Sequence, residues 1–185
     1  ADNILSRLLA FNSLPAAGQG LLVRRELAIE LGGFDPALRS AEDWDFCIRL
    51  AMRGDPFLLD EPLVGYRTGF ESLSTNTAVM GATIAAVFDK HAALRERLGV
   101  KPDWGAVHQS LFTAELLNSR AAVLRRSRRL LRHAPTARNL ARCVAGTVSP
   151  DWWFARSQQT RRDQVPEAWR TSASAWLADV GDASL

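Results

Sequence analysis

Residues 40–50, Ser-Ala-Glu-Asp-Trp-Asp-Phe-Cys-Ile-Arg-Leu, are the stretch of the 185-residue chain that decides its fold. A serine followed three residues later by an acid, and then by apolar residues at helical spacing, predicts a helix that Ser40 caps and that has Asp43 in its first turn. The helix dipole favours acids at this point, so Glu42 and Asp43 fit a purely structural role. A carboxylate held there is also ionised and fixed in direction, as a general base requires.

Composition bounds the class of protein. Apolar residues make up 47% of the chain and charged residues 23%, which is typical of a globular protein, and no apolar run is long enough to span a bilayer. The cysteines Cys47 and Cys143 offer neither a metal-site spacing nor a disulfide framework, which favours a reducing compartment. The chain opens without an initiator methionine or a signal peptide, and we expect it to be a fragment of a longer protein.

Short patterns on both sides of residues 40–50 predict alternating helices and strands. Residues 2–11 and 24–31 have helical spacing, and Gly32-Gly33 ends the second of these segments. Three short apolar runs, bounded by glycine, proline or acidic residues, predict buried strands. These runs are Leu21–Val23, Phe57–Leu59 and Leu63–Arg67.

In their order and separation, several motifs resemble the C-terminal, acceptor-side half of a family 2 glycosyltransferase catalytic domain of the GT-A type. The motifs are Gly-Leu-Leu-Val-Arg-Arg-Glu-Leu (20–27), Leu-Gly-Gly-Phe-Asp-Pro (31–36), the acids at 42–43, Glu-Pro-Leu-Val-Gly-Tyr-Arg (61–67) and Ser-Leu-Ser (72–74). The resemblance covers about residues 1–75. It implies an α/β fold class, with a partial GT-A sheet in residues 1–76. The nucleotide-binding half of such a domain would precede residue 1.

The resemblance implies transfer of a sugar from a nucleotide-sugar donor to an acceptor hydroxyl, with inversion. Asp43 matches the general base, and the adjacent Glu42 is the alternative if the alignment is displaced by one residue. Gly20 leads into the strand that borders the acceptor pocket. Trp44 could form a sugar-stacking platform beside the base, although a tryptophan in a first helical turn more often packs in the core.

The donor side of the implied site is less complete. Arg67 and Ser74 border the loop, residues 68–76, that would close over the donor nucleotide, and a guanidinium fork matches phosphate oxygens. A surface arginine at a strand end is the alternative for Arg67. Many relatives carry a histidine where this chain has Gly69, which puts metal dependence in question.

Asp43-Trp44-Asp45 has the form of a DxD metal motif. Positions i and i+2 of a helix do not face a common ligand, so we do not interpret it as one. We therefore expect no metal site and no cofactor within this chain. Mg²⁺ or Mn²⁺ would act only in the complete enzyme.

The second half predicts a helical extension, residues 77–148, and a loosely ordered tail, residues 149–185. Helical spacing runs over 77–98 and from about 107 to 133, where Leu116, Val123 and Leu130 recur every seven residues, as do Leu117, Leu124 and Leu131. The net charge is +3, and residues 120–142 contain many arginines and no acid. A basic amphipathic helix near tryptophans suits an anionic membrane surface, and a solvated face is the simpler alternative.

The expected partners are a nucleotide-sugar donor and a saccharide or lipid-linked acceptor, without nucleic acid. The expected location is the cytoplasm, with peripheral contact at the inner face of the membrane. The alternative function is a non-catalytic helical interaction module, which binds a protein partner or an anionic membrane surface through the arginine-rich helix.

Overall fold

The computed structural model describes residues 3–14, 17–57, 59, 63–64, 77–115, 120–163 and 165–182. Over these residues the regular structure is helical and contains no strand. The elements are α1 Ile4–Ala10, the 3₁₀ turn η1 Ala17–Gly20, α2 Arg25–Glu30, α3 Glu42–Ala51, α4 Thr77–Lys90, α5 Ala92–Leu98, α6 Trp104–Glu115, α7 Arg120–His133, α8 Ala137–Val148, α9 Pro150–Asp163 and α10 Glu167–Asp182. The predicted α/β class with a partial GT-A sheet is therefore wrong for the described part of the chain.

The runs predicted to be strands lie in irregular segments where the structure describes them. Leu21–Val23 joins η1 to α2, and Leu22 is 93% exposed. Phe57, Leu59, Leu63 and Val64 are also exposed and irregular, while the other residues of those two runs lie outside the described residues. A strand needs a neighbour to pair its N–H and C=O groups, and no described segment supplies one.

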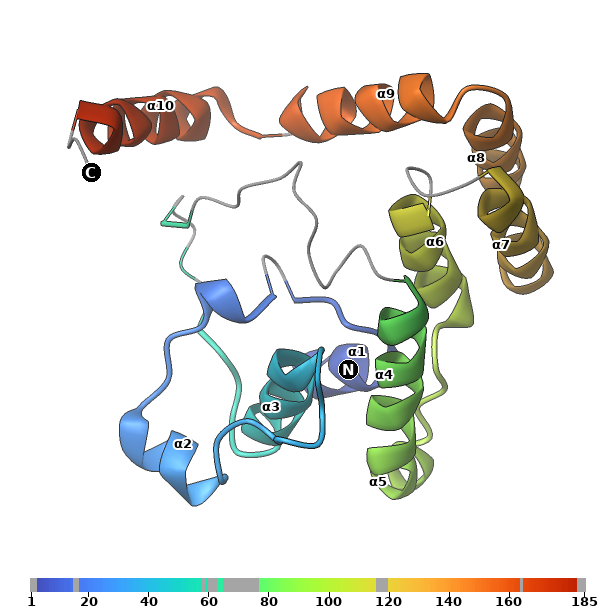
Figure 1. The fold of residues 1–185 in the computed structure, drawn as a ribbon. Helices are drawn as coiled ribbons and strands as arrows, with labels where there is room; N and C mark the ends of the chain where they lie inside the picture. Colours follow the sequence, from blue (N-terminus) through green and yellow to red (C-terminus); the bar gives the residue numbers. More distant parts are fainter. Residues whose placement is uncertain are drawn as a thin grey trace.

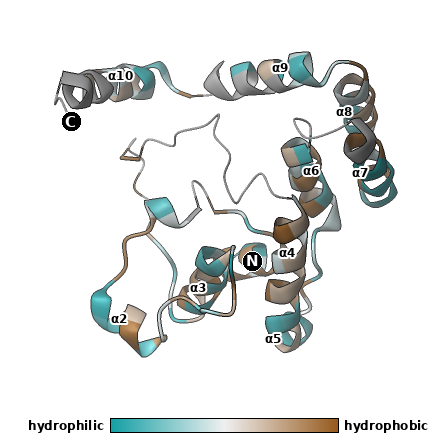
Figure 2. Cartoon of the chain, viewed as in Figure 1, coloured by the Kyte–Doolittle hydropathy of each residue, from teal (hydrophilic) through white to brown (hydrophobic). Residues whose placement is uncertain are grey.

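Two hydrophobic cores hold together α1, α3, α4, α6, α7 and α8, and Figure 1 shows how these helices are arranged. Helices α1, α3, α4 and α6 form the first core, and α6, α7 and α8 form the second. Leu111 packs in the first core and Phe112 in the second, because successive residues of a helix point about 100° apart. Val123 and Leu130 are fully buried in the second core, as their spacing predicts, whereas Leu124 of the other seven-residue series is 51% exposed. Leu116 and Leu117 lie outside the described residues. In Figure 2, α4 is coloured towards the hydrophobic end of the scale and α5 towards the hydrophilic end.

Glycines end two of the helices where the sequence predicts it. Gly32 and Gly33 follow α2 with φ of +78° and +66°, and Gly99 follows α5 with φ of +66°. Only glycine adopts these angles without a steric cost. The helix predicted over residues 77–98 is divided at His91 into α4 and α5.

Helices α9 and α10 occupy most of residues 149–185, the segment for which the sequence predicts loose order. Helix α9 packs against α8, and α9 and α10 follow one another along the top of the view in Figure 1. Among the described residues, no helix has both the length and the apolarity needed to cross a bilayer.

Candidate active site

Helix α3 starts at Glu42, so both candidate acids lie in its first turn. The preceding residue, Ala41, has φ 57° and ψ 21°, in the left-handed region. This conformation costs a non-glycine residue about 1–2 kcal/mol, and the surrounding packing must hold it. Ala41 occupies the cap position, and the hydroxyl of Ser40 instead donates to Thr83 Oγ1 of α4 at 2.9 Å. The prediction that Ser40 caps the helix is therefore wrong, because Ala41 lies between Ser40 and the first helical residue, Glu42.

The carboxylate of Asp43 is held by two backbone N–H groups. The Gly18 N–H donates to Oδ2 at 2.7 Å, and the Trp44 N–H donates to Oδ1 at 2.7 Å. Each carboxylate oxygen can accept a further hydrogen bond, and Asp43 is only partly buried. The group is thus fixed in direction and retains the acceptor capacity that a general base needs.

The turn η1 comes close to Asp43 because Gly18 has no side chain. A Cβ atom at Gly18 would lie 2.9 Å from Asp43 Cβ, closer than carbon atoms pack. Gly20, the predicted acceptor-side residue, lies exposed at the end of the same turn. Sequence reasoning missed the role of Gly18, although the pattern Gly18-Gln19-Gly20 was visible.

Trp44 points into the first core. It is 1% exposed, its Nε1–H donates to the Leu8 carbonyl at 2.8 Å, and its ring meets Phe88 edge to face at 5.4 Å. This is the packing alternative, and in this conformation the ring is closed to a sugar. Glu42 is partly buried, and within the described chain its side chain has neither a hydrogen bond nor an ion pair.

Asp45, which is fully buried, pairs with three basic side chains. Its Oδ2 accepts a hydrogen bond from Arg49 Nε at 2.9 Å, and its Oδ1 lies 2.9 Å from Lys90 Nζ and 2.8 Å from His91 Nε2. We call these four residues the Asp45 cluster. Burial acts to raise the pKa of Asp45, but the hydrogen bonds from Lys90, His91 and Arg49 outweigh it and hold the pKa below its ordinary 3.8. Asp45 is therefore a charged structural residue.

Arg49 extends the cluster to the loop between α2 and α3. Its guanidinium donates to the carbonyls of Leu31 and Gly33, each at 2.6 Å. Lys90 likewise pairs with Asp35 of the same loop. The cluster thus joins this loop, α3 and the junction of α4 with α5, and it fixes the helix that carries Asp43.

Cys47 lies one helical turn after Asp43. Burial, and secondly the charge of Asp43, raise the pKa of its thiol to about 11. The thiol is therefore protonated at neutral pH, which argues against a nucleophilic role.

The predicted donor side of the site lies in a part of the chain that the structure does not describe. Arg67 and Ser74, the predicted donor-phosphate residues, lie outside the described residues, as does the predicted closing loop 68–76. Within the described ranges, no group of three or more His, Cys, Asp or Glu side chains could hold a metal ion. Comparisons with protein-family models, curated proteins and solved structures find no match for this chain.

Replacing Gly18 by alanine should separate η1 from Asp43. The added Cβ meets Asp43 Cβ at 2.9 Å, so we expect a loss of about 1–3 kcal/mol in the free energy of unfolding, the usual cost of overpacking. Urea unfolding measures this loss. Gly54→Ala is the matched control, because a Cβ there meets no atom within 4 Å. Equal effects of the two substitutions would show that η1 and Asp43 are not in close contact.

Proposed function

We propose that the Asp43 site is the acceptor side of an inverting glycosyltransferase. The observation that carries this proposal is the Asp43 carboxylate, fixed in direction by the Gly18 backbone and partly open to a ligand. The order of the motifs from Gly20 to Ser74 supports it, and so does the strained backbone of Ala41 directly before the acids. The proposal does not depend on a GT-A sheet. On the donor side the proposal keeps Arg67 and Ser74, which lie outside the described residues.

In the proposed reaction the acceptor hydroxyl donates a hydrogen bond to the free acceptor position of the Asp43 carboxylate. As the hydroxyl oxygen attacks the anomeric carbon, its proton moves to Asp43, and the bond from that carbon to the nucleoside diphosphate breaks. The diphosphate leaves with the bonding electron pair. The N–H groups of Gly18 and Trp44 keep the carboxylate aimed during the transfer.

Mg²⁺ or Mn²⁺ would offset the charge of the leaving diphosphate in the complete enzyme. The described acids of this site do not fit such an ion, because Asp45 is enclosed by three basic side chains and Asp43 is bound by backbone N–H groups. Metal ligands would therefore belong with the donor-binding residues.

Asp43→Asn should remove the base and preserve the fold. The amide oxygen can accept only one of the two backbone hydrogen bonds, and the amide NH2 group faces the other N–H, so we expect the fold to persist with a loss of about 1–3 kcal/mol in the free energy of unfolding. Turnover should fall by about 10² to 10⁴, the usual contribution of a general base, with donor affinity near normal. The measurement is nucleoside diphosphate release from a panel of nucleotide sugars, in the longest natural polypeptide that contains this chain.

Glu42→Gln is the matched control, because it removes the neighbouring charge in the same helical turn. Loss of turnover in Glu42→Gln with normal turnover in Asp43→Asn would assign the base to the other carboxylate. Normal turnover in both variants would overturn the mechanism.

The second candidate function, peripheral binding to an anionic membrane surface, is favoured by an exposed apolar stripe. Leu140, Val144 and Val148 of α8 and Trp152 of α9 recur every four residues, and their exposed fractions are 53%, 56%, 71% and 58%. These side chains line a shallow groove with almost no polar surface. Arg138, on the same helix, is exposed.

The charge of the neighbouring helix matches an anionic surface. Arg125, Arg128 and Arg132 of α7 are exposed, and residues 120–142 contain no acid to offset them. Apolar side chains that enter the headgroup region beside arginines are the usual arrangement of a peripheral membrane helix. The chain would then work at the inner face of the membrane, where a lipid-linked acceptor would also lie.

We expect the protein to co-sediment with vesicles of phosphatidylglycerol and phosphatidylcholine and not with pure phosphatidylcholine. The double variant Arg132→Gln/Arg138→Gln should bind about 30-fold more weakly, since each arginine contributes about 1 kcal/mol near such a surface. Arg24→Gln/Arg25→Gln, at exposed positions near α2, changes the net charge equally and is the control. Equal binding to both vesicle types, or equal losses in both variants, would exclude membrane binding through α7 and α8.

A further inference from the structure

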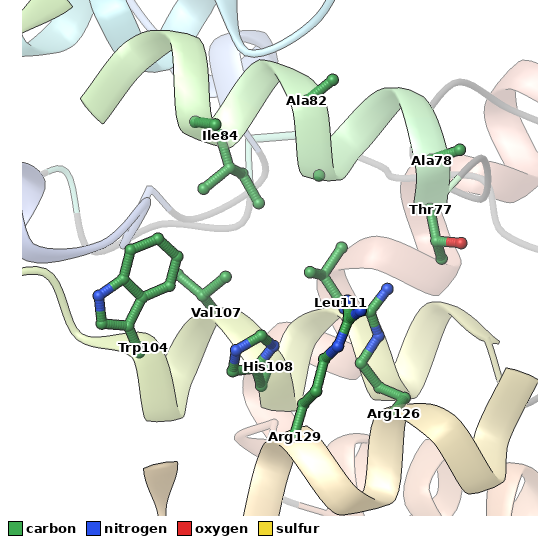
Figure 3. A pocket seen from close by; sticks show the side chains of 12 residues that line it. Thr77, Ala78, Ala82, Ile84, Trp104, Val107, His108, Leu111, Arg126 and Arg129 are labelled. Carbon is green, nitrogen blue, oxygen red and sulfur yellow. The ribbon is translucent and has the colours of Figure 1, made fainter. Parts of the chain in front are cut away.

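A cavity of about 320 Å³ lies between α4, α6 and α7, apart from the Asp43 site (Figure 3). One wall is apolar and consists of small residues of α4 together with Ile84, Trp104, Val107 and Leu111. The other wall carries His108 of α6 and two arginines of α7, Arg126 and Arg129. Figure 3 shows these three side chains directed into the same space from α6 and α7, below α4. The cavity is thus divided into an apolar and a cationic side.

The cationic side contains buried polar atoms that no described residue satisfies. His108 Nδ1 and Arg126 Nε are both buried without a hydrogen-bond partner in the protein. Buried polar atoms in folded proteins are nearly always paired, so unpaired ones that line a cavity are the groups that a ligand or a water in the cavity would meet. Two such atoms on adjacent helices, α6 and α7, point to a ligand that accepts hydrogen bonds.

Positive charge at this wall exceeds negative charge. Arg126 pairs with Glu115 at 2.7 Å, but Arg129 has no acidic partner among the described residues. The rings of His108 and His133 lie 4.9 Å apart, so a further basic group adjoins the wall. Burial, followed by the charges of His133, Arg126 and Arg129, lowers the pKa of His108 to about 4. Glu115 is the acidic residue that the structure places beside these basic groups, and its carboxylate is already paired with Arg126.

We propose that this cavity binds a small organic oxyanion, with its charged group at Arg129, Arg126 and His108 Nδ1 and its apolar part against Trp104 and α4. A guanidinium fork matches the oxygens of a phosphate or a carboxylate, and neutral His108 donates to the same group from Nδ1. The alanine and glycine residues of α4 leave the space that the apolar part occupies. The site is independent of the glycosyltransferase proposal.

Phenyl phosphate is the probe, measured by calorimetry on the 185-residue chain, with inorganic phosphate and benzyl alcohol as the two partial ligands. We expect phenyl phosphate to bind more tightly than either of them. Arg129→Gln should weaken binding by about tenfold or more, the loss expected for one charge-assisted hydrogen bond. Arg128→Gln is the matched control, because Arg128 is the neighbouring residue of the same helix, is exposed like Arg129, and does not line the cavity. Its effect should stay within about twofold, since Arg128 does not line the cavity and salt screens its charge from a ligand there.

Histidine NMR signals provide a second measurement. Bound phenyl phosphate stabilises protonated His108, so the pKa of His108 should rise from about 4 on saturation. Equal losses of phenyl phosphate affinity in Arg129→Gln and Arg128→Gln would overturn the proposed site. An unchanged His108 titration at saturating phenyl phosphate would also overturn it. Equal affinity for inorganic phosphate would overturn the apolar half of the assignment, and equal affinity for benzyl alcohol would overturn the anionic half.

Discussion

The structure of the first core depends on one buried charge, the carboxylate of Asp45. A buried carboxylate is tolerated only when it is paired and fully hydrogen-bonded, and here Arg49, Lys90 and His91 satisfy both oxygens. Arg49 and Lys90 are partly exposed, so their own charges are less costly, and His91 is buried beside Asp45. Arg49 continues the network to the carbonyls of Leu31 and Gly33. One ionised group therefore determines where three separate segments meet.

This constraint explains how a helical domain can hold Asp43 in one direction. Asp43 precedes Asp45 by two residues, so it faces another side of the helix that the cluster fixes. The Gly18 N–H and the bond from Ser40 to Thr83 then set the position of the first turn. A rigid helix start is equally compatible with a purely structural role for Asp43. The feature that favours a general base is the partial exposure of Asp43, which leaves its carboxylate open to an acceptor.

Local patterns predicted the helices before residue 149 well, missed α9 and α10, and predicted the long-range partners poorly. The ends of α2 at Gly32 and of α5 at Gly99 were predicted correctly, and so was the buried side of α7. These features depend on residue spacing and backbone angles, which are set by neighbours in the sequence. Leu21–Val23 was predicted to be a strand. Whether such a run forms a strand depends on a second strand that pairs with it, which local sequence does not reveal. The spacing of Asp45 and Arg49 was visible, whereas His91 comes from 46 residues away. Polar partners of that kind, like the walls of the α4–α6–α7 cavity, appear only once the helices are packed.

The most direct measurement of the central claim is the free energy of unfolding of the wild type and of Asp45→Asn as a function of pH. Because the folded protein holds the pKa of Asp45 below 3.8, its stabilising effect is present above that pH and is lost as the pH falls through the folded pKa. We expect the variant to be less stable by about 3 kcal/mol at neutral pH, with the difference closing in acid. A difference that is near zero at neutral pH, or that stays constant down to low pH, would contradict the role assigned to Asp45.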